Sequence, residues 1–294
     1  IKHIYVDLED RDWDAAETES LKFAYEFRKK FPAVDMIDAY QFFAGLRIIK
    51  EDYELDLMRK AIKITTDGIA EMMKNAHANM YEYEIEAYFD YVLTKNGVRD
   101  KAFKTIAASG KRGTILHYSD NHALAEDGDL ILIDAGAQVD WYNGDISRTF
   151  PVNGKFTPLQ KQIYDIVLSG QQKVIDTIKP GTRFSRLNEV LKEHYFEELK
   201  KIGLVETPED VAKYYYHGVS HYLGAETHDI GRYGDRILEP GMVLTVEPGL
   251  YIEEYSIGIR IEDDALVTDN GCEILSEGFM KTTDEIEAFM AGGK

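Results

Sequence analysis

The sequence contains a single cysteine, Cys272, among its 294 residues. One cysteine cannot form a disulfide within the chain, and such sparse use of cysteine fits a reducing compartment, so we expect a cytoplasmic location. No apolar run approaches the roughly 20 residues that a membrane-spanning helix requires, and no apolar signal core follows the start at Ile1. We therefore expect a soluble protein that has no membrane partner.

Basic residues are also scarce. The chain has 34 Lys and Arg against 53 Asp and Glu, which gives a formal net charge of −19. Because so acidic a surface repels a phosphate backbone, nucleic acid is not an expected partner. Apolar residues nevertheless make up 44% of the chain, enough for a large buried core and one or two domains. This composition excludes a disordered or fibrous chain.

The hydrophobic pattern divides the chain near residue 45. Residues 1–45 predict one strand, an amphipathic helix over about 14–30 and a short helix that ends near Gly45, which is too little for a domain of its own. Residues 46–50 are expected to be a connector. We therefore place a domain boundary there and assign residues 46–294 to a second, larger domain.

An order of helix, helix and strands occurs twice in the larger domain. The repeat indicates an internal duplication, so a site between the halves would draw residues from both. A long helix is expected from Asp52, with its apolar face running to Met72. Further helices are expected at about 82–96 (ended by Gly97), 158–178, 185–202 and 283–290, with a shorter one from Pro208. The expected strands lie at about 102–109, 129–138, 145–152, 242–248 and 257–268.

Carboxylates occur at strand positions, which ordinarily disfavour them. In the first half an apolar run ends in Asp134, and Asp145 follows the next turn on the returning strand, so a hairpin brings the two together. In the second half a similar run ends in Glu247, and three alternating isoleucines leave Arg260 and Glu262 on the opposite face of their strand. Each acid alone is equally compatible with a solvated surface position, but their joint placement favours a shared site.

Three of the eight histidines, His217, His221 and His228, lie within twelve residues. The spacing of the first two invites comparison with the zinc-protease helix motif, but Gly218 stands where that motif requires glutamate, which excludes it. If the segment is extended, His217, Val219 and His221 point to one face, and two imidazoles can reach one cavity. A pair of hydrogen-bonded histidines in a loop is the alternative.

Four carboxylates and an imidazole that converge from two strand pairs require cations to neutralise their charge. We therefore predict two divalent metal ions. Oxygen-rich ligation with a single nitrogen favours manganese, with zinc, cobalt and iron as alternatives. Two ions about 3.5–4 Å apart, bridged by carboxylates, can hold a bridging hydroxide at neutral pH and polarise a carbonyl, which is the chemistry of a hydrolase.

The order and context of these residues match a known pattern. Asp134 and Asp145 are eleven residues apart, His221 lies in His-Gly-Val-Ser-His, Glu247 in Val-Glu-Pro-Gly and Glu262 in Gly-Ile-Arg-Ile-Glu-Asp-Asp. The chain resembles the metallopeptidases of the methionine aminopeptidase, prolidase and aminopeptidase P superfamily, and most closely the Xaa-Pro aminopeptidases.

The resemblance covers about residues 46–294 and implies a fold. That fold is the α+β, duplicated pita-bread fold, in which a curved, mostly antiparallel sheet is flanked by helices. Members of the family usually carry a whole amino-terminal domain before the catalytic one. The resemblance therefore implies that residues 1–45 are a remnant, the last strand and helices, of an amino-terminal creatinase-like domain.

The resemblance also implies a role for each site residue. Asp134 is the implied ligand of one metal, Asp145 and Glu262 bridge both metals, and His221 and Glu247 complete the second. Glu247 is also the implied general base. His228 is implied to stabilise the oxyanion of the tetrahedral intermediate.

Further residues are implied on the substrate side. His117 is implied to lie beside the scissile nitrogen, and His217 and Arg260 to support substrate and ligands, with Tyr251 as a further candidate. Without the resemblance, His117 is interpreted as an ordinary buried histidine and Arg260 as the partner of a neighbouring acid.

The implied activity is a metal-dependent exopeptidase that releases the N-terminal residue from peptides with proline in the second position, acting as a homo-oligomer, a dimer or higher. The bond before proline has no N–H, so a site that binds the free amino terminus and the carbonyl oxygen has no need of that hydrogen. The alternatives are a prolidase, which cuts only Xaa-Pro dipeptides, and a non-catalytic pita-bread module that binds a partner in its groove.

Overall fold

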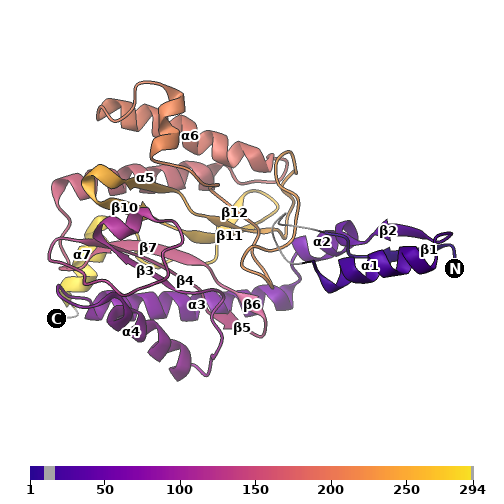
Figure 1. Cartoon of the computed structure of the whole chain (residues 1–294). Helices are drawn as coiled ribbons and strands as arrows, with labels where there is room; N and C mark the ends of the chain where they lie inside the picture. The colour runs from indigo at the N-terminus through magenta and orange to yellow at the C-terminus, as the bar shows by residue number, and fades with distance from the viewer. Residues whose placement is uncertain (10–16, 293–294) are drawn as a thin grey trace.

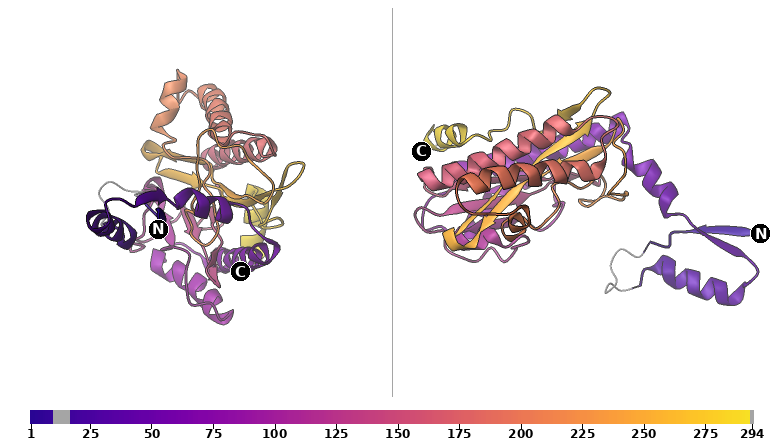
Figure 2. Two further views of the ribbon diagram at one scale, coloured as in Figure 1. Left: turned by 90° about the vertical axis from the view of Figure 1, so that its right-hand side faces the viewer. Right: turned by 90° about the horizontal axis from the view of Figure 1, so that it is seen from above.

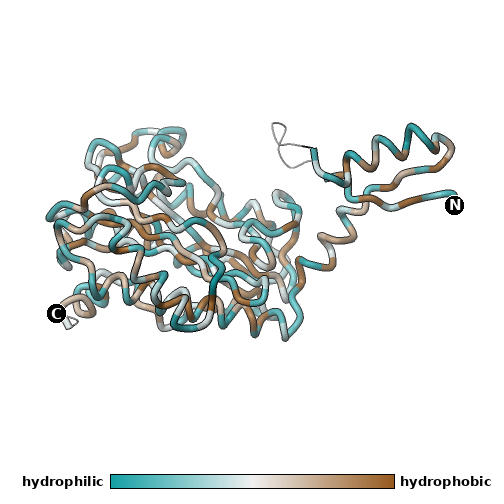
Figure 3. Tube along the Cα trace, turned by 60° about the horizontal axis from the view of Figure 1, so that its bottom comes forward, coloured by the Kyte–Doolittle hydropathy of each residue, from teal (hydrophilic) through white to brown (hydrophobic). Residues whose placement is uncertain are grey.

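The computed structural model describes residues 1–9 and 17–292. Its N-terminal part projects from the main body (Figures 1 and 2). In this part β1 (His3–Val6) pairs in parallel with β2 (Asp35–Asp38), and α1 (Glu19–Lys30) lies between them in sequence. The start of the helix predicted over 14–30 falls partly outside the described residues. Apolar residues recur among polar ones along α1, as expected for an amphipathic helix (Figure 3).

The segment predicted as a connector is largely helical, which corrects that expectation. Helix α2 (Tyr40–Ile48) runs past Gly45 because Tyr40, Ala44 and Ile48 form a buried stripe at four-residue spacing. The chain then joins the body through a β-bridge between Ile49 and Met242.

Two helix pairs flank the strands of the body (Figure 1). In the first half they are α3 (Asp52–Asn75) and α4 (Glu82–Lys95), and Gly97 follows with a φ of 76°, as predicted for a left-handed cap. In the second half they are α5 (Pro158–Thr177) and α6 (Phe184–Lys201). The expected order of helices is therefore confirmed in both halves.

Short helices complete the chain. Among the described residues they are the 3₁₀ helices η1 (Gly110–Thr114), η2 (Pro208–Lys213) and η3 (Glu253–Tyr255), and the α-helix α7 (Thr283–Gly292). The short helix predicted from Pro208 is thus present, as a 3₁₀ helix. No helix in the described part of the chain has the length and apolar character needed to cross a membrane.

Each half contributes a three-stranded antiparallel sheet. The first sheet has the order β3 (Ile106–Ser109), β4 (Leu130–Ala135), β7 (Ile146–Pro151), and the second has the order β12 (Cys272–Ile274), β11 (Asp263–Val267), β8 (Val243–Val246). Two further antiparallel pairs are β9 (Gly249–Ile252) with β10 (Ile257–Arg260), and β5 (Gln138–Val139) with β6 (Tyr142–Asn143).

The strand pattern differs from the predicted one in two respects. The run predicted as one strand over 257–268 is two strands, β10 and β11, which belong to different sheets, and the residues between them include Glu262. Strands β2, β6, β9 and β12 were not predicted, and β6 lies in a segment that was expected to be a turn. A single large hydrophobic core spans both halves and packs the helices against the sheets.

Candidate metal centre

The predicted acidic ligands occupy equivalent positions in the two halves. Asp134 lies near the end of β4 and Asp145 comes directly before its partner β7. Glu247 comes directly after β8, and Glu262 directly before its partner β11. The strand registers pair Ala135 with Ile146 and Val246 with Asp263, so each pair of acids stands at one end of an antiparallel hairpin.

Hydrogen bonds between the halves bring the two pairs together. The Glu262 N–H donates to the Ser147 carbonyl oxygen at 3.0 Å, and the Asp145 N–H donates to the Asp264 carboxylate at 3.1 Å. As a result, one ligand atom each of Asp145, His221 and Glu262 lie within 4.8 Å of one another. This is the separation expected of side chains that share a metal ion.

The histidine segment runs beside β8 and places His221 at the acids. The Thr245 N–H donates to the His221 carbonyl, and the Glu247 N–H to the Val219 carbonyl, both at 2.9 Å. The His221 Nδ1 lies 3.0 Å from the Tyr222 carbonyl, which can only accept, so Nδ1 carries the proton and Nε2 is free to act as a ligand. This Nε2 is 3.5 Å from Asp145 Oδ2 and 3.7 Å from Glu247 Oε1.

One detail of the predicted histidine segment is wrong. His217 and His221 both line the same cavity, as expected, but Val219 is buried in the hydrophobic core rather than on their face. The segment is extended beside β8 without being a regular strand, because bends at His217 and Val219 break the two-residue alternation.

The electrostatics of the cluster indicate that cations belong in it. Burial raises the pKa of the Asp145 and Glu262 carboxyls well above their ordinary values, and neighbouring carboxylates raise it further. Burial also raises the pKa of Glu247 to about 7. The Asp134 Oδ1 atom is buried and has no hydrogen-bond partner in the described part of the chain. Four carboxylates and one imidazole in this arrangement fit the ligand set of divalent metal ions.

A chain of buried polar side chains extends from Asp134. The Arg260 guanidinium donates to Asp134 Oδ2 at 2.6 Å, to Ser147 Oγ at 2.9 Å and to the Tyr251 hydroxyl oxygen at 3.0 Å. The Tyr251 hydroxyl lies 2.9 Å from Nε2 of His217, while His217 Nδ1 faces the Gly218 carbonyl at 2.7 Å, so Tyr251 donates to a neutral ring. Burial and the Arg260 charge lower the pKa of His217 to about 4, which keeps the ring neutral near pH 7.

Sequence reasoning missed Ser147. Its hydroxyl donates to Glu262 Oε2 at 2.7 Å and accepts from Arg260, so it connects a predicted ligand to the predicted supporting arginine. The signal was present in the sequence: Ser147 is two residues from Asp145 and therefore shares its face of the strand.

All nine predicted site residues line one cavity of about 900 Å³. They are His117, Asp134, Asp145, His217, His221, His228, Glu247, Arg260 and Glu262. His117 is exposed at this cavity, so the alternative interpretation as an ordinary buried histidine is wrong. The exposed His228 meets His221 edge to face, with ring centroids 4.5 Å apart. Arg260, in contrast, combines both interpretations, since it lines the cavity and pairs with Asp134.

Comparison with known proteins identifies related sequences. The model of metallopeptidase family M24 matches residues 56–269. The chain is 41% identical over 277 residues to the Xaa-Pro aminopeptidase of Escherichia coli, which covers 88% of this chain and 63% of that protein. It is 34% identical over 299 residues to the Xaa-Pro dipeptidase of Rattus norvegicus, which covers 84% of this chain and 61% of that protein. The chain thus spans less than two thirds of the length of these relatives.

Solved structures agree with the sequence comparison. Aminopeptidase P from Escherichia coli, with the inhibitor Pro-Leu, superimposes with a TM-score of 0.90 at 36% identity, over 100% of this chain and 71% of that one. A protein from Bacillus anthracis that is provisionally assigned as an aminopeptidase P gives a TM-score of 0.96 at 52% identity, over 100% of this chain and 70% of that one. The predicted pita-bread fold is thereby confirmed, and the chain belongs to metallopeptidase family M24.

Proposed function

We propose that this chain is an Xaa-Pro aminopeptidase, which releases the N-terminal residue from peptides with proline in the second position. The observation that carries the proposal is the meeting of five potential ligands from both halves in one cavity that three further histidines also line. The similarity to Xaa-Pro aminopeptidases supports the same substrate class.

The residues that would hold two divalent metal ions are the four acids and the imidazole of the cluster, with Asp145 and Glu262 shared between both ions and manganese as the expected metal. When bound, the ions supply a hydroxide nucleophile at neutral pH and polarise the scissile carbonyl. Bound cations would offset the mutual repulsion of the ionised carboxylates, which supports this assignment of the cluster.

The chain's own side chains supply the proton transfers and the binding contacts. Glu247, at the end of β8, accepts the proton of the attacking water as general base and returns it to the leaving nitrogen. His228, exposed beside His221, donates to the oxyanion that forms on the carbonyl oxygen. His117, in the segment between β3 and β4, contacts the scissile nitrogen. His217, held neutral by burial and by the Arg260 charge, lines the substrate side of the cavity and accepts a hydrogen bond from Tyr251.

Proline in the second position suits such a site. The nitrogen of the scissile bond in an Xaa-Pro peptide belongs to proline and carries no hydrogen, so a peptidase that must bind an N–H at this position binds it poorly. Recognition through the free amino terminus and the carbonyl oxygen needs no such contact. The proposed partners are therefore peptides rather than nucleic acids or membranes, in keeping with the net charge of −19.

The proposal extends to the surroundings of the catalytic domain. Residues 1–45 are proposed to be a remnant of an amino-terminal creatinase-like domain, a view supported by their separate two-stranded sheet and their projection from the body (Figure 2). A homo-oligomer, dimer or higher, and a cytoplasmic location are proposed with it, the latter on the single cysteine.

Hydrolysis of Gly-Pro-Ala beside Gly-Pro by the manganese-loaded chain tests the activity. We expect cleavage of the tripeptide, its loss in Glu247→Gln, and wild-type rates in Glu277→Gln, which removes an exposed acid outside the cavity. Cleavage of the dipeptide alone would instead assign a dipeptidase, as in the rat relative. If the metal-loaded chain cleaves neither peptide, the proposed function is wrong.

Metal analysis tests the ligand assignment without any assay of activity. The double variant Asp145→Ala, Glu262→Ala removes both proposed shared ligands, so we expect it to retain no bound manganese after desalting. Retention of wild-type metal content by this variant would contradict the assignment. Glu277→Gln again provides the control and is expected to bind metal as the wild type does.

A further inference from the structure

His117 reaches the cavity from an irregular segment, residues 109–123, which we name the His117 loop. Apart from Ser109, which ends β3, and from η1, the loop has no regular secondary structure, and it leads from β3 toward β4. Leu116, His117 and Ser119 of this loop line the cavity. The position of the His117 imidazole therefore depends on what fixes the loop to the body.

A single buried carboxylate makes most of that attachment. Glu82, the first residue of α4, is completely buried. Its Oε1 accepts hydrogen bonds from the Ser109 N–H and hydroxyl, both at 2.8 Å, and from Arg112 Nε at 3.0 Å. Its Oε2 accepts from the Tyr118 hydroxyl at 2.8 Å and from the Ala123 N–H at 2.9 Å.

These five hydrogen bonds are spread along the whole loop. Ser109 is its first residue, Tyr118 is the neighbour of His117, and Ala123 is its last residue. The Glu82 N–H also donates to the Ala123 carbonyl at 2.9 Å, so the end of the loop is held from both sides. Because Tyr118 is anchored at its hydroxyl, the adjacent His117 is left on the side that faces the cavity.

The next turn of the same helix adds a second attachment. Glu86 lies four residues after Glu82 and accepts from Asn121 Nδ2 at 2.7 Å, and the same Nδ2 donates to the Thr105 carbonyl at 2.9 Å. Asn121 has a φ of 49°, a left-handed conformation that this pair of contacts holds in place. Two acids on one face of α4 thus hold the loop, Glu82 at both ends and Glu86 at Asn121.

We propose that Glu82 is a positioning residue, which sets the place of His117 in the active-site cavity through the hydrogen bonds of the His117 loop. The inference rests on the proposed function for the role of His117. Glu82 contacts none of the five proposed metal ligands, so it acts on the substrate side of the cavity and leaves metal binding unaffected.

A double-mutant cycle with His117 distinguishes positioning from simple stabilisation. Glu82→Gln keeps the shape of the side chain but presents an amide group to hydrogen-bond donors, so the loop shifts. A displacement of about 1 Å can cost roughly 100-fold in rate, and we expect a loss of kcat/KM of that order for the tripeptide. His117→Ala should lose activity as well, and the double variant should be no worse than His117→Ala alone. The manganese content of each variant should equal that of the wild type.

Glu84→Gln is the matched control. It makes the same chemical change on the same helix, two residues away, at an exposed side chain. It should keep the wild-type kcat/KM. If Glu82→Gln does not fold, Tyr118→Phe removes one of the five hydrogen bonds and enters the same cycle, with a smaller loss expected.

Amide hydrogen exchange tests the inference independently of activity. Exchange in Glu82→Gln should be faster across residues 109–123 and unchanged in β8 and β11. Additive losses in the cycle, wild-type kinetics in Glu82→Gln, or unchanged exchange in the loop would each overturn the inference. If the wild-type chain cleaves neither peptide, the proposed function fails, and the exchange experiment alone then decides whether Glu82 fixes the loop.

Discussion

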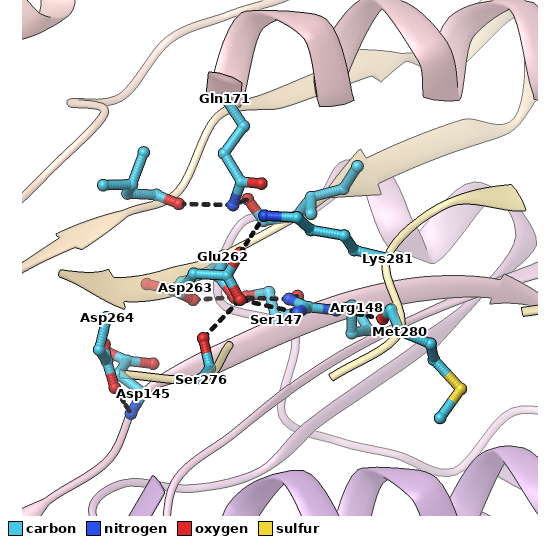
Figure 4. A network of polar contacts seen from close by, with 12 residues as sticks. Asp145, Ser147, Arg148, Gln171, Glu262, Asp263, Asp264, Ser276, Met280 and Lys281 are labelled. Atoms are coloured by element: carbon cyan, nitrogen blue, oxygen red, sulfur yellow. Dashed lines mark hydrogen bonds and ion pairs between the residues drawn. The ribbon is translucent and has the colours of Figure 1, made fainter. Parts of the chain in front are cut away.

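Arg148 connects the two halves directly behind the candidate metal centre, and its removal is expected to destabilise the fold strongly. Figure 4 shows this completely buried guanidinium between the halves. It pairs with Asp263 Oδ1 at 2.7 Å and donates to the carbonyl oxygens of Ser147, Glu262 and Met280 at 3.0, 2.6 and 2.9 Å. Arg148 thus binds β7 of the first half to β11 of the second.

The expected cost follows from what Arg148→Met leaves behind. Asp263 is also completely buried, and three carbonyl oxygens lose a charged donor. Breaking a buried ion pair from one side costs about 3–5 kcal/mol of unfolding free energy, because the remaining charge lacks full compensation. Lys281 also pairs with Asp263, at 3.2 Å, but its side chain is 29% exposed. Lys281→Met leaves Asp263 with Arg148 and should cost about 1 kcal/mol or less.

Urea unfolding, followed by tryptophan fluorescence and circular dichroism, measures both variants against the wild type. We expect a lower midpoint for Arg148→Met, a small shift for Lys281→Met, and partial recovery when Asp263→Leu is added to Arg148→Met, since no unpaired charge then remains. A wild-type midpoint for Arg148→Met, or equal losses in the two single variants, would refute the reasoning.

Two further predictions concern packing and pH. Gly68→Ala would place a Cβ 2.4 Å from the Phe89 ring where α3 crosses α4, so it should cost about 1–3 kcal/mol in urea unfolding, whereas Gly45→Ala, with open space around its Cβ, should cost nothing. Burial lowers the pKa of His194, whose buried Nδ1 has no hydrogen-bond partner among the described residues. The unfolded chain therefore binds more protons below about pH 6.5, and stability falls as the pH decreases. His194→Gln should reduce the drop in Tm between pH 7.5 and 5, and an unchanged drop would contradict this assignment.

The elements that the sequence predicts well are those with a strong hydrophobic periodicity. Helices α3 to α6 each carry a long apolar stripe, and α4 ends before Gly97 as expected. Helix α2 was misjudged beyond Gly45 because its stripe of Tyr40, Ala44 and Ile48 is short. Strands β9 and β12 have only four and three residues, and their existence depends on pairing with β10 and β11 rather than on a local pattern.

The site residues likewise divide into those that the sequence reveals and those that only the folded structure brings together. Acids at strand ends are conspicuous in a sequence because strands disfavour them, so Asp134 and Glu247 could be singled out. Arg148 could not, because its partners Glu262 and Asp263 lie more than 110 residues away and only the folded sheets bring them together. Glu82 was hidden for a different reason. An acid in the first turn of a helix is ordinarily exposed to solvent and interacts favourably with the positive end of the helix dipole. The neighbouring sequence does not show that Glu82 is buried.

The most direct test of the account is a manganese titration of tripeptide hydrolysis by the metal-stripped chain. The account predicts no cleavage of Gly-Pro-Ala without metal and a rate that rises to a plateau at two manganese ions per chain, because both halves supply ligands to one centre. Full activity after verified removal of metal, or no cleavage at any manganese concentration, would contradict it.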